Sequence, residues 1–113
     1  MRVRWKESQR VAALVNAVAN QCFTNCFWVK KSLECYKKAL IVRGTVILRI
    51  DDESWEEPHV WLEKNGWIID PTLVLVRTEG DKFTHKPVRK FKKLPKVGQF
   101  CGVLVPLGDF CAD

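Results

Sequence analysis

Three residues, Cys22, His59 and Asp70, have the types and the spacing for chemistry at a thiol. His59 and Asp70 lie on either side of the dipeptide Asn65-Gly66, which favours a two-residue type I′ turn between antiparallel strands. Such a hairpin makes His59 and Asp70 diagonal neighbours on one face, where an imidazole can reach a carboxylate. The pattern predicts a histidine that Asp70 holds through one ring nitrogen, with the other nitrogen free.

The same turn fixes the register of the hairpin and the face on which each side chain lies. It places Trp61 opposite Asp70 and Glu63 opposite Ile68. Because side chains alternate along a strand, one face is expected to carry His59, Trp61, Glu63, Ile68 and Asp70. The other face is the expected core side, and it carries Val60, Leu62, Trp67 and Ile69.

A free imidazole nitrogen needs a nucleophile, and Cys22 is the best candidate among the five cysteines. It lies in the first turn of a predicted helix, where unpaired amide groups and the helix dipole favour a thiolate. The same amides can stabilise the oxyanion of an acyl-transfer intermediate. Cys26 lies one turn deeper, and Cys35 lies near the opposite end, where the dipole opposes ionisation.

Two helices are expected before the hairpin. Ser8 is the predicted N-cap of the first, whose apolar residues recur at helical spacing: Val11, Leu14, Val15 and Val18. Asn20 is the predicted N-cap of the second, which runs from about Cys22 to Lys38. One stripe of this second helix carries Cys22, Cys26, Val29, Leu33 and Tyr36.

The remaining segments read mainly as strands. Branched aliphatic residues from Ala39 to Ile50 predict a long buried strand that is bulged at Gly44. Residues 51–57 are expected to form an acidic loop, 73–77 to extend or follow the hairpin, and 100–107 to form a last strand. Helices followed by strands indicate an α+β domain with the helices packed on an antiparallel sheet.

The composition describes a single globular domain over residues 1–113, with 47% hydrophobic residues and a net charge of +6. Five cysteines cannot all pair internally, so free thiols in a reducing compartment and a cytoplasmic location are expected. No stretch is long and apolar enough for a membrane span, and no signal-peptide pattern follows Met1.

The segment HVWLEKNGWIIDPT, from His59 to Thr72, resembles the histidine and aspartate blocks of the transglutaminase-like superfamily of papain-related Cys-His-Asp enzymes. Upstream, Gln21-Cys-Phe-Thr-Asn25 resembles the block that opens the nucleophile helix in small members of that superfamily. The strand around Arg43-Gly44 fits the first strand after that helix.

The resemblance implies that Cys22 is the nucleophile, His59 the general base and acid, and Asp70 the residue that orients His59. It also implies a papain-like fold and a protein, peptide or other amide substrate, which is hydrolysed, deamidated or transferred to an amine. This chemistry requires no cofactor and no metal. Gln21 and Phe23 stand where many members have glycine and tryptophan, so the resemblance does not assign the oxyanion donor or the acyl acceptor.

Two further residues are predicted to contact the substrate. Trp61 shares the face of His59 and is expected to wall the substrate cleft, and Gln21 precedes the nucleophile.

Three alternatives remain open. A basic binding module would use Lys82 to Lys96, with Phe83 and Phe91, to bind nucleic acid or an acidic protein. A catalytically inactive member of the same fold would act as an inhibitor or adaptor. Zinc binding through Cys22 and Cys26 is the weakest alternative, because no second cysteine pair lies at ligand spacing. The sequence does not indicate an oligomeric state.

Overall fold

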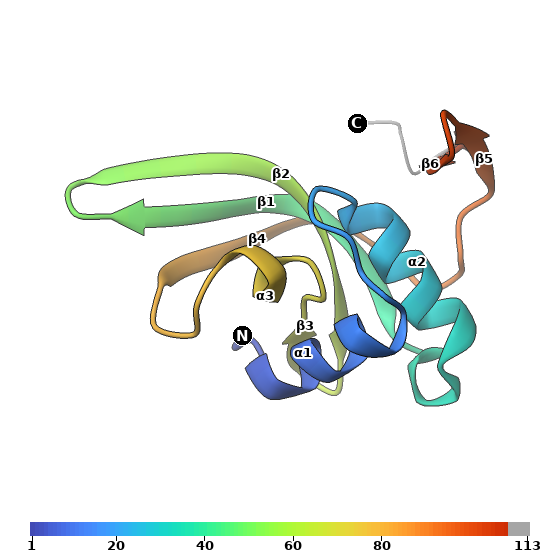
Figure 1. The fold of residues 1–113 in the computed structure, drawn as a ribbon, viewed down its shortest axis with the longest axis horizontal. Coiled ribbons are helices and arrows are strands. Elements are labelled where there is room, and N and C mark those ends of the chain that lie inside the picture. Colours follow the sequence, from blue (N-terminus) through green and yellow to red (C-terminus); the bar gives the residue numbers. More distant parts are fainter. Residues whose placement is uncertain (109–113) are drawn as a thin grey trace.

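The computed structural model describes residues 1–108 and confirms an α+β architecture. Its helices are α1 (Trp5–Leu14), α2 (Cys22–Ser32), a 3₁₀ turn η1 (Glu34–Tyr36) and α3 (Leu73–Val76). Four antiparallel strands form one sheet in the order β3-β2-β1-β4: β1 (Leu40–Ile50), β2 (Glu53–Lys64), β3 (Trp67–Ile69) and β4 (Lys82–Phe91). A separate hairpin follows, made of β5 (Val97–Phe100) and β6 (Val103–Pro106) (Figure 1).

The predicted hairpin between β2 and β3 is confirmed. Glu63 pairs with Ile68 as expected, and the turn residues Asn65 and Gly66 both have positive φ, at 53° and 79°. A type I′ turn requires positive φ at both positions. The strand β3 ends at Ile69, so the expected ladder pair of Trp61 with Asp70 does not form. The side chain of Asp70 nevertheless lies on the same face of the sheet as that of His59.

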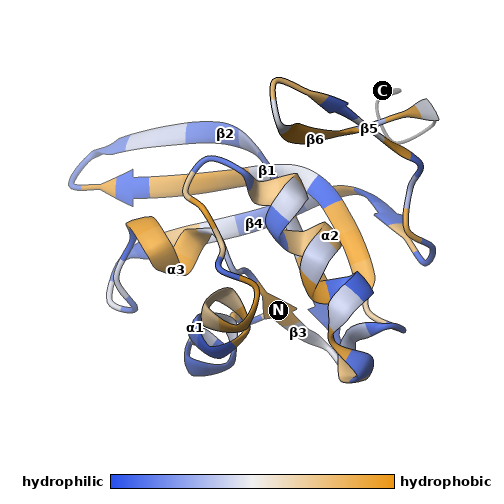
Figure 2. Ribbon diagram, turned by 45° about the vertical axis from the view of Figure 1, so that its right-hand side comes forward, coloured by the Kyte–Doolittle hydropathy of each residue, from blue (hydrophilic) through white to orange (hydrophobic). Residues whose placement is uncertain are grey.

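The acidic loop expected at 51–57 is wrong. Only Asp51 and Asp52 form the turn, and β2 begins at Glu53 and pairs residue for residue with β1. The carboxylates are tolerated in a strand because the outer half of β2 is exposed to solvent. Figure 1 shows the long β1–β2 hairpin projecting from the body of the protein, and Figure 2 shows its β2 arm more hydrophilic than its β1 arm.

Both faces of the sheet are covered, whereas the sequence predicted a single core side. The expected core residues Val60, Leu62 and Ile69 pack with α2 and with Val11 of α1. On the face of His59, Trp61 and Ile68 are also buried, in a second cluster that includes Val42 and Val3. The chain after β3 and the N-terminal Trp5 cover that second face, which is why it can hold a buried site.

The helix boundaries differ from the predicted ones. Arg4, not Ser8, is the N-cap of α1, which ends at Leu14; α2 is capped by Gln21 and ends at Ser32. Asn20 has a left-handed φ of 65°, which places it in the preceding loop. Leu33 is extended, so the predicted helix to Lys38 breaks there. The predicted strand over 100–107 is shortened to β6, because Cys101 and Gly102 form a turn. None of the helices within residues 1–108 is long and apolar enough to cross a membrane.

Gly44 is required where β1 and β4 meet. The predicted irregularity is confirmed as a register shift between Arg43 and Gly44. A Cβ at Gly44 would lie 2.1 Å from the carbonyl oxygen of Lys86 and 2.8 Å from Cη2 of Trp61.

We expect Gly44→Ala to lower the free energy of unfolding by about 3 kcal/mol, because the backbone has to move to admit the methyl group. Urea denaturation checks this value against Gly80→Ala, where nothing lies within 4 Å of the added carbon; equal stability of the two variants would contradict it.

Candidate active site

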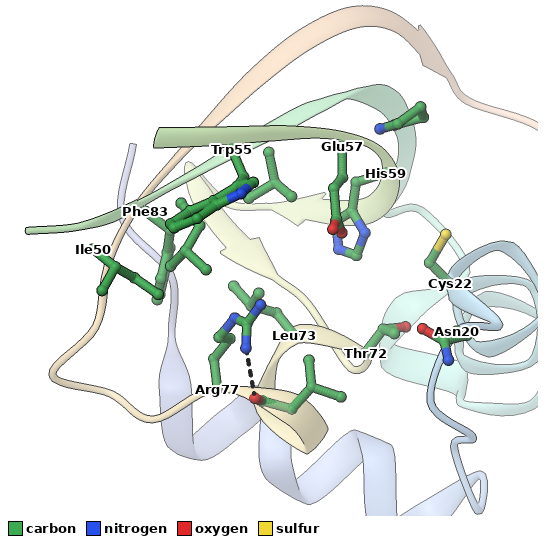
Figure 3. Close-up of a pocket in the computed structure, with 14 residues that line it drawn as sticks. Asn20, Cys22, Ile50, Trp55, Glu57, His59, Thr72, Leu73, Arg77 and Phe83 are labelled. Atoms are coloured by element: carbon green, nitrogen blue, oxygen red, sulfur yellow. Dashed lines mark hydrogen bonds between the residues drawn. The ribbon is translucent and has the colours of Figure 1, made fainter. Parts of the chain in front are cut away.

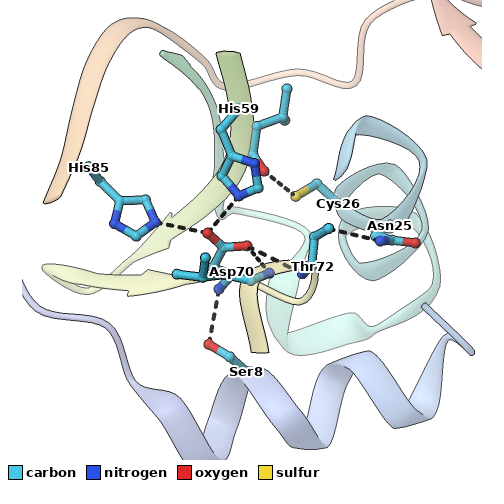
Figure 4. A network of polar contacts seen from close by, with 9 residues as sticks. Ser8, Asn25, Cys26, His59, Asp70, Thr72 and His85 are labelled. Carbon is cyan, nitrogen blue, oxygen red and sulfur yellow. Dashed lines mark hydrogen bonds and ion pairs between the residues drawn. The ribbon is translucent and has the colours of Figure 1, made fainter. Parts of the chain in front are cut away.

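Asp70 lies at the centre of the hydrogen-bond network of the site. It follows β3 and is fully buried. Its Oδ1 accepts the amide hydrogens of Thr72 at 3.3 Å and Leu73 at 3.0 Å, and its own amide donates to Oγ of Ser8 at 3.0 Å. These bonds hold the carboxylate in one orientation with Oδ2 directed at the sheet (Figure 4). Ser8, which the sequence suggested as a helix cap, instead bridges Asp70 to the carbonyl oxygen of Arg4 at 2.7 Å.

His59 makes the predicted contact with Asp70. Its Nε2 donates to Oδ2 of Asp70 at 2.8 Å. Burial disfavours the charged imidazole, but the hydrogen bond to Asp70 and the interaction with the Cys22 side chain outweigh burial and raise the pKa of His59 to about 10. Because Nε2 is engaged, Nδ1 is the ring nitrogen left to exchange a proton with a substrate or nucleophile.

His85 is a second histidine at the same carboxylate, and the sequence pattern does not single it out. Its Nε2 lies 2.8 Å from Oδ2 of Asp70, and its side chain is only 2% exposed. The edges of Trp61 and Phe83 enclose the ring, at centroid distances of 4.8 Å and 5.9 Å. Burial opposes ionisation of Asp70, but the two histidines reverse that effect and hold the pKa of Asp70 low.

Cys22 is the first residue of α2 and lines the same cleft as His59. Its side chain is partly exposed and lies at the end of the cleft where His59 also lies (Figure 3). Cys22 and His59 thus share one cleft, and Asp70 lies behind the imidazole in the interior. Because Cys22 begins α2, the amides of the first turn of this helix have no partner within the helix.

The other cysteines have different surroundings. Cys26 is fully buried, its thiol donates to the carbonyl oxygen of Val60 at 3.6 Å, and burial raises the pKa of that thiol well above its ordinary value. A zinc pair of Cys22 and Cys26 does not fit this arrangement, because one sulfur lies in the core and the other in the cleft. Cys35 and Cys101 are exposed, and Cys111 lies outside the described residues.

Asn25 joins the start of α2 to the segment that carries Asp70. Its buried side-chain amide donates to the carbonyl oxygen of Val18 and to Oγ1 of Thr72, both at 2.8 Å, and accepts the amide hydrogen of Val18 at 3.0 Å. Cys22 and Asp70 are thus held on two segments that one side chain links.

The cleft has a volume of about 410 Å³ and its polar end carries Asn20, Cys22, Glu57, His59 and Thr72 (Figure 3). The two residues predicted to contact the substrate do not line it. Trp61 is 1% exposed and its ring stacks against His59 at 6.0 Å, so it supports the imidazole from within the protein. Gln21 caps α2, and its carbonyl oxygen accepts the amide hydrogen of Asn25 at 2.9 Å.

The ligand atoms of His59, Asp70 and His85 lie within 4.8 Å of one another, which is a spacing that a metal ion could use. Both imidazoles, however, lie 2.8 Å from the same carboxylate oxygen. Direct hydrogen bonds therefore occupy the space between the ligand atoms, and the arrangement fits a proton network better than an ion.

The basic segment is mostly the strand β4. Its two aromatic residues are both half-buried: Phe83 lines the cleft and stacks on Trp5 at 5.8 Å, and Phe91 packs against the main core cluster. Lys90 forms an ion pair with Glu63 at 2.9 Å. Neither aromatic ring is therefore presented for stacking on nucleic-acid bases.

We expect His85→Phe to lower the free energy of unfolding by about 2 kcal/mol, because the buried Asp70 loses one of its donors. His85→Gln, which keeps a donor, should lose less. Urea denaturation measures both, and exposed Lys86→Gln next to it on β4 serves as the control. Equal losses in the phenylalanine and glutamine variants would contradict the importance of the hydrogen bond.

A scan against models of known protein families finds no match to this chain, and searches of curated proteins and of solved structures find no significant match either.

Proposed function

We propose that the protein is a cysteine-dependent acyl-transfer enzyme that acts on amide or peptide bonds. One observation carries the proposal: Cys22 and His59 line the same cleft, while the buried Asp70 holds the far nitrogen of His59 at 2.8 Å. A nucleophile, a base and a group that orients the base are the parts that covalent acyl transfer needs.

The reaction begins with the thiol proton of Cys22 already on Nδ1 of His59, where the raised pKa of the imidazole holds it. The sulfur attacks the carbonyl carbon of the amide, and the first-turn amides of α2 stabilise the oxyanion that forms. His59 then gives its proton to the leaving amine, and a thioester remains on Cys22. Water or a second amine, activated by His59, attacks the thioester and restores the thiol. Asp70 keeps the imidazole oriented throughout.

The arrangement of elements supports a transglutaminase-like, papain-related fold as the finer assignment. A helix that begins with the cysteine packs on an antiparallel sheet, and the histidine and aspartate come from that sheet and its end, in the chain order that the resemblance implies. A cytoplasmic location is part of the proposal, because a reducing compartment preserves a catalytic thiol.

A turnover assay tests the proposal. The protein is incubated with a mixed peptide digest and a small primary amine, and the products are identified by mass, which separates hydrolysis and deamidation from transfer to the amine. We expect Cys22→Ala to abolish product formation, whereas Cys35→Ala, at an exposed thiol outside the cleft, leaves it unchanged. Undiminished turnover in Cys22→Ala would reject the proposed function.

A further inference from the structure

The cleft that begins at Cys22 and His59 continues into a second half made of apolar side chains. These come from β1, β2, β4 and α3, and include Leu48, Ile50, Trp55, Leu73, Val76 and Phe83. Figure 3 shows Cys22 at one end of the cleft and Ile50, Trp55 and Phe83 at the other. A molecule bound at the sulfur therefore has one direction in which an apolar group can extend.

The length of this half is set by β2. Trp55 and His59 lie on the same face of β2, and a strand rises about 3.3 Å per residue, so the apolar end lies roughly 13 Å from the imidazole. This distance matches an extended peptide of about four residues, or a hydrocarbon or aromatic arm of similar length. The cleft volume of about 410 Å³ is typical of sites for small molecules or short segments.

The apolar end is left open to solvent. Ile50 is 50% exposed and Trp55 is 46% exposed, although both lie on the face of the sheet that is otherwise well covered. Exposing apolar surface to water costs free energy, so a ligand that covers these side chains gains binding free energy from their burial.

Arg77 adds a charge to this end of the cleft. Its side chain lines the cleft, as that of His59 does, and Figure 3 shows it directed into the cleft. Its guanidinium donates to the carbonyl oxygen of Val76 at 3.4 Å, and within residues 1–108 it forms no ion pair with a carboxylate. An anionic group on a ligand would complement it.

We propose that the cleft selects an amide substrate that carries a bulky hydrocarbon or aromatic arm in the apolar end and a carboxylate against Arg77. This specificity rests on the proposed function, because the arm is useful only if it positions an amide for attack by Cys22. The substrate class is therefore an acidic, apolar acyl donor such as a peptide segment with a large apolar side chain beside an acidic one.

Three thiol reagents test the specificity: iodoacetamide, N-(4-phenylbutyl)iodoacetamide, and an analogue of the second with a carboxylate beside the amide nitrogen. In each case the sulfur displaces iodide. The rate at Cys22 is measured by mass spectrometry relative to the rate at the exposed Cys35 in the same molecule. We expect the phenylbutyl arm to raise this ratio about tenfold, and the carboxylate to raise it about threefold more.

Variants separate the two parts of the cleft. Ile50→Lys and Trp55→Lys should remove the effect of the arm, and Arg77→Gln the effect of the carboxylate, each measured as the rate relative to that of the same variant with iodoacetamide. Val88→Lys changes an apolar residue that is 64% exposed and lies outside the cleft lining, and should change nothing.

The outcomes distinguish this inference from the proposed function. If Cys22 reacts rapidly with iodoacetamide but gains nothing from the arm or the carboxylate, the specificity is overturned and the proposed function stands. If Cys22 reacts no faster than Cys35 with any reagent, the proposed function is lost. In that case, calorimetry measures the binding of the unreactive N-(4-phenylbutyl)acetamide to the cleft. Saturable binding that Trp55→Lys abolishes supports the apolar site, and the absence of binding overturns it.

Discussion

Replacing His59 by glutamine is expected to slow the alkylation of Cys22 by iodoacetamide near neutral pH by about a hundredfold, because glutamine cannot take the thiol proton. Glutamine still offers a hydrogen-bond donor to Asp70, so the fold should be retained. In the unaltered protein, mass mapping should find Cys22 modified before Cys35 and Cys101, although both of these are more exposed. Cys26 should stay unmodified, because it is buried and the pKa of its thiol is raised.

The exposed cysteines provide the control for this experiment. The rates at Cys35 and Cys101 should be the same with and without the His59→Gln substitution, since neither lines the cleft. An unchanged rate at Cys22, or faster labelling of Cys35 in the unaltered protein, would contradict a functional thiol–imidazole pair.

Replacing Asp70 by asparagine is expected to lower the free energy of unfolding by about 3 to 5 kcal/mol, because two buried histidines lose their shared charged partner. The loss should depend on pH. Asp70 has its pKa lowered from 3.8 to about 2, so its contribution is present above 3.8 and disappears as pH falls through the lower value. His59 has its pKa raised from 6.5 to about 10, so its contribution is complete below 6.5 and disappears as pH rises through the higher value.

The unaltered protein should therefore be most stable between the two ordinary values, 3.8 and 6.5, and should lose stability toward alkaline pH. Urea denaturation over this pH range measures the effect. Asp70→Asn should flatten the alkaline decline, whereas Asp52→Asn, at the exposed tip of the β1–β2 hairpin, should leave the profile unchanged. Parallel pH profiles for the unaltered protein and Asp70→Asn would contradict the linkage.

The features of the site that could be predicted from the sequence are those that depend on residues close together in the chain. The dipeptide Asn65-Gly66 specifies a turn geometry, the turn specifies the register, and alternation then brings His59 to Asp70. The position of Cys22 at the start of α2 follows equally from the local pattern.

The part that could not be predicted depends on contacts between distant segments. His85 reaches Asp70 only because β4 pairs with β1, so that His85 lies opposite Val46. In the sequence it stands among lysines, and nothing local distinguishes it from a solvated charge. Trp61 is buried beneath His59 for the same reason: Gly44 lets its ring approach the neighbouring strand, and the second face of the sheet is covered.

The outer half of the cleft could not be predicted, because the acidic residues before His59 are typical of a loop, whereas in the structure they belong to a strand. Glu53 to Glu57 belong to β2, and this extension of the strand places Trp55 and Glu57 on the face of His59. The pairing with the apolar β1, which lies before it in the chain, decides the conformation, and composition alone does not report that pairing.

Acyl transfer to Cys22 is tested by intact-protein mass spectrometry after brief exposure to an activated acyl donor such as p-nitrophenyl acetate, followed by peptide mapping. If Cys22, His59 and Asp70 act together in acyl transfer, one acetyl group should appear on Cys22 and be released over time, and in His59→Gln both its formation and its release should be slower, because both steps lack their base. Acetylation that is spread over Cys35, Cys101 and the lysines, with no preference for Cys22, would contradict a catalytic role for Cys22.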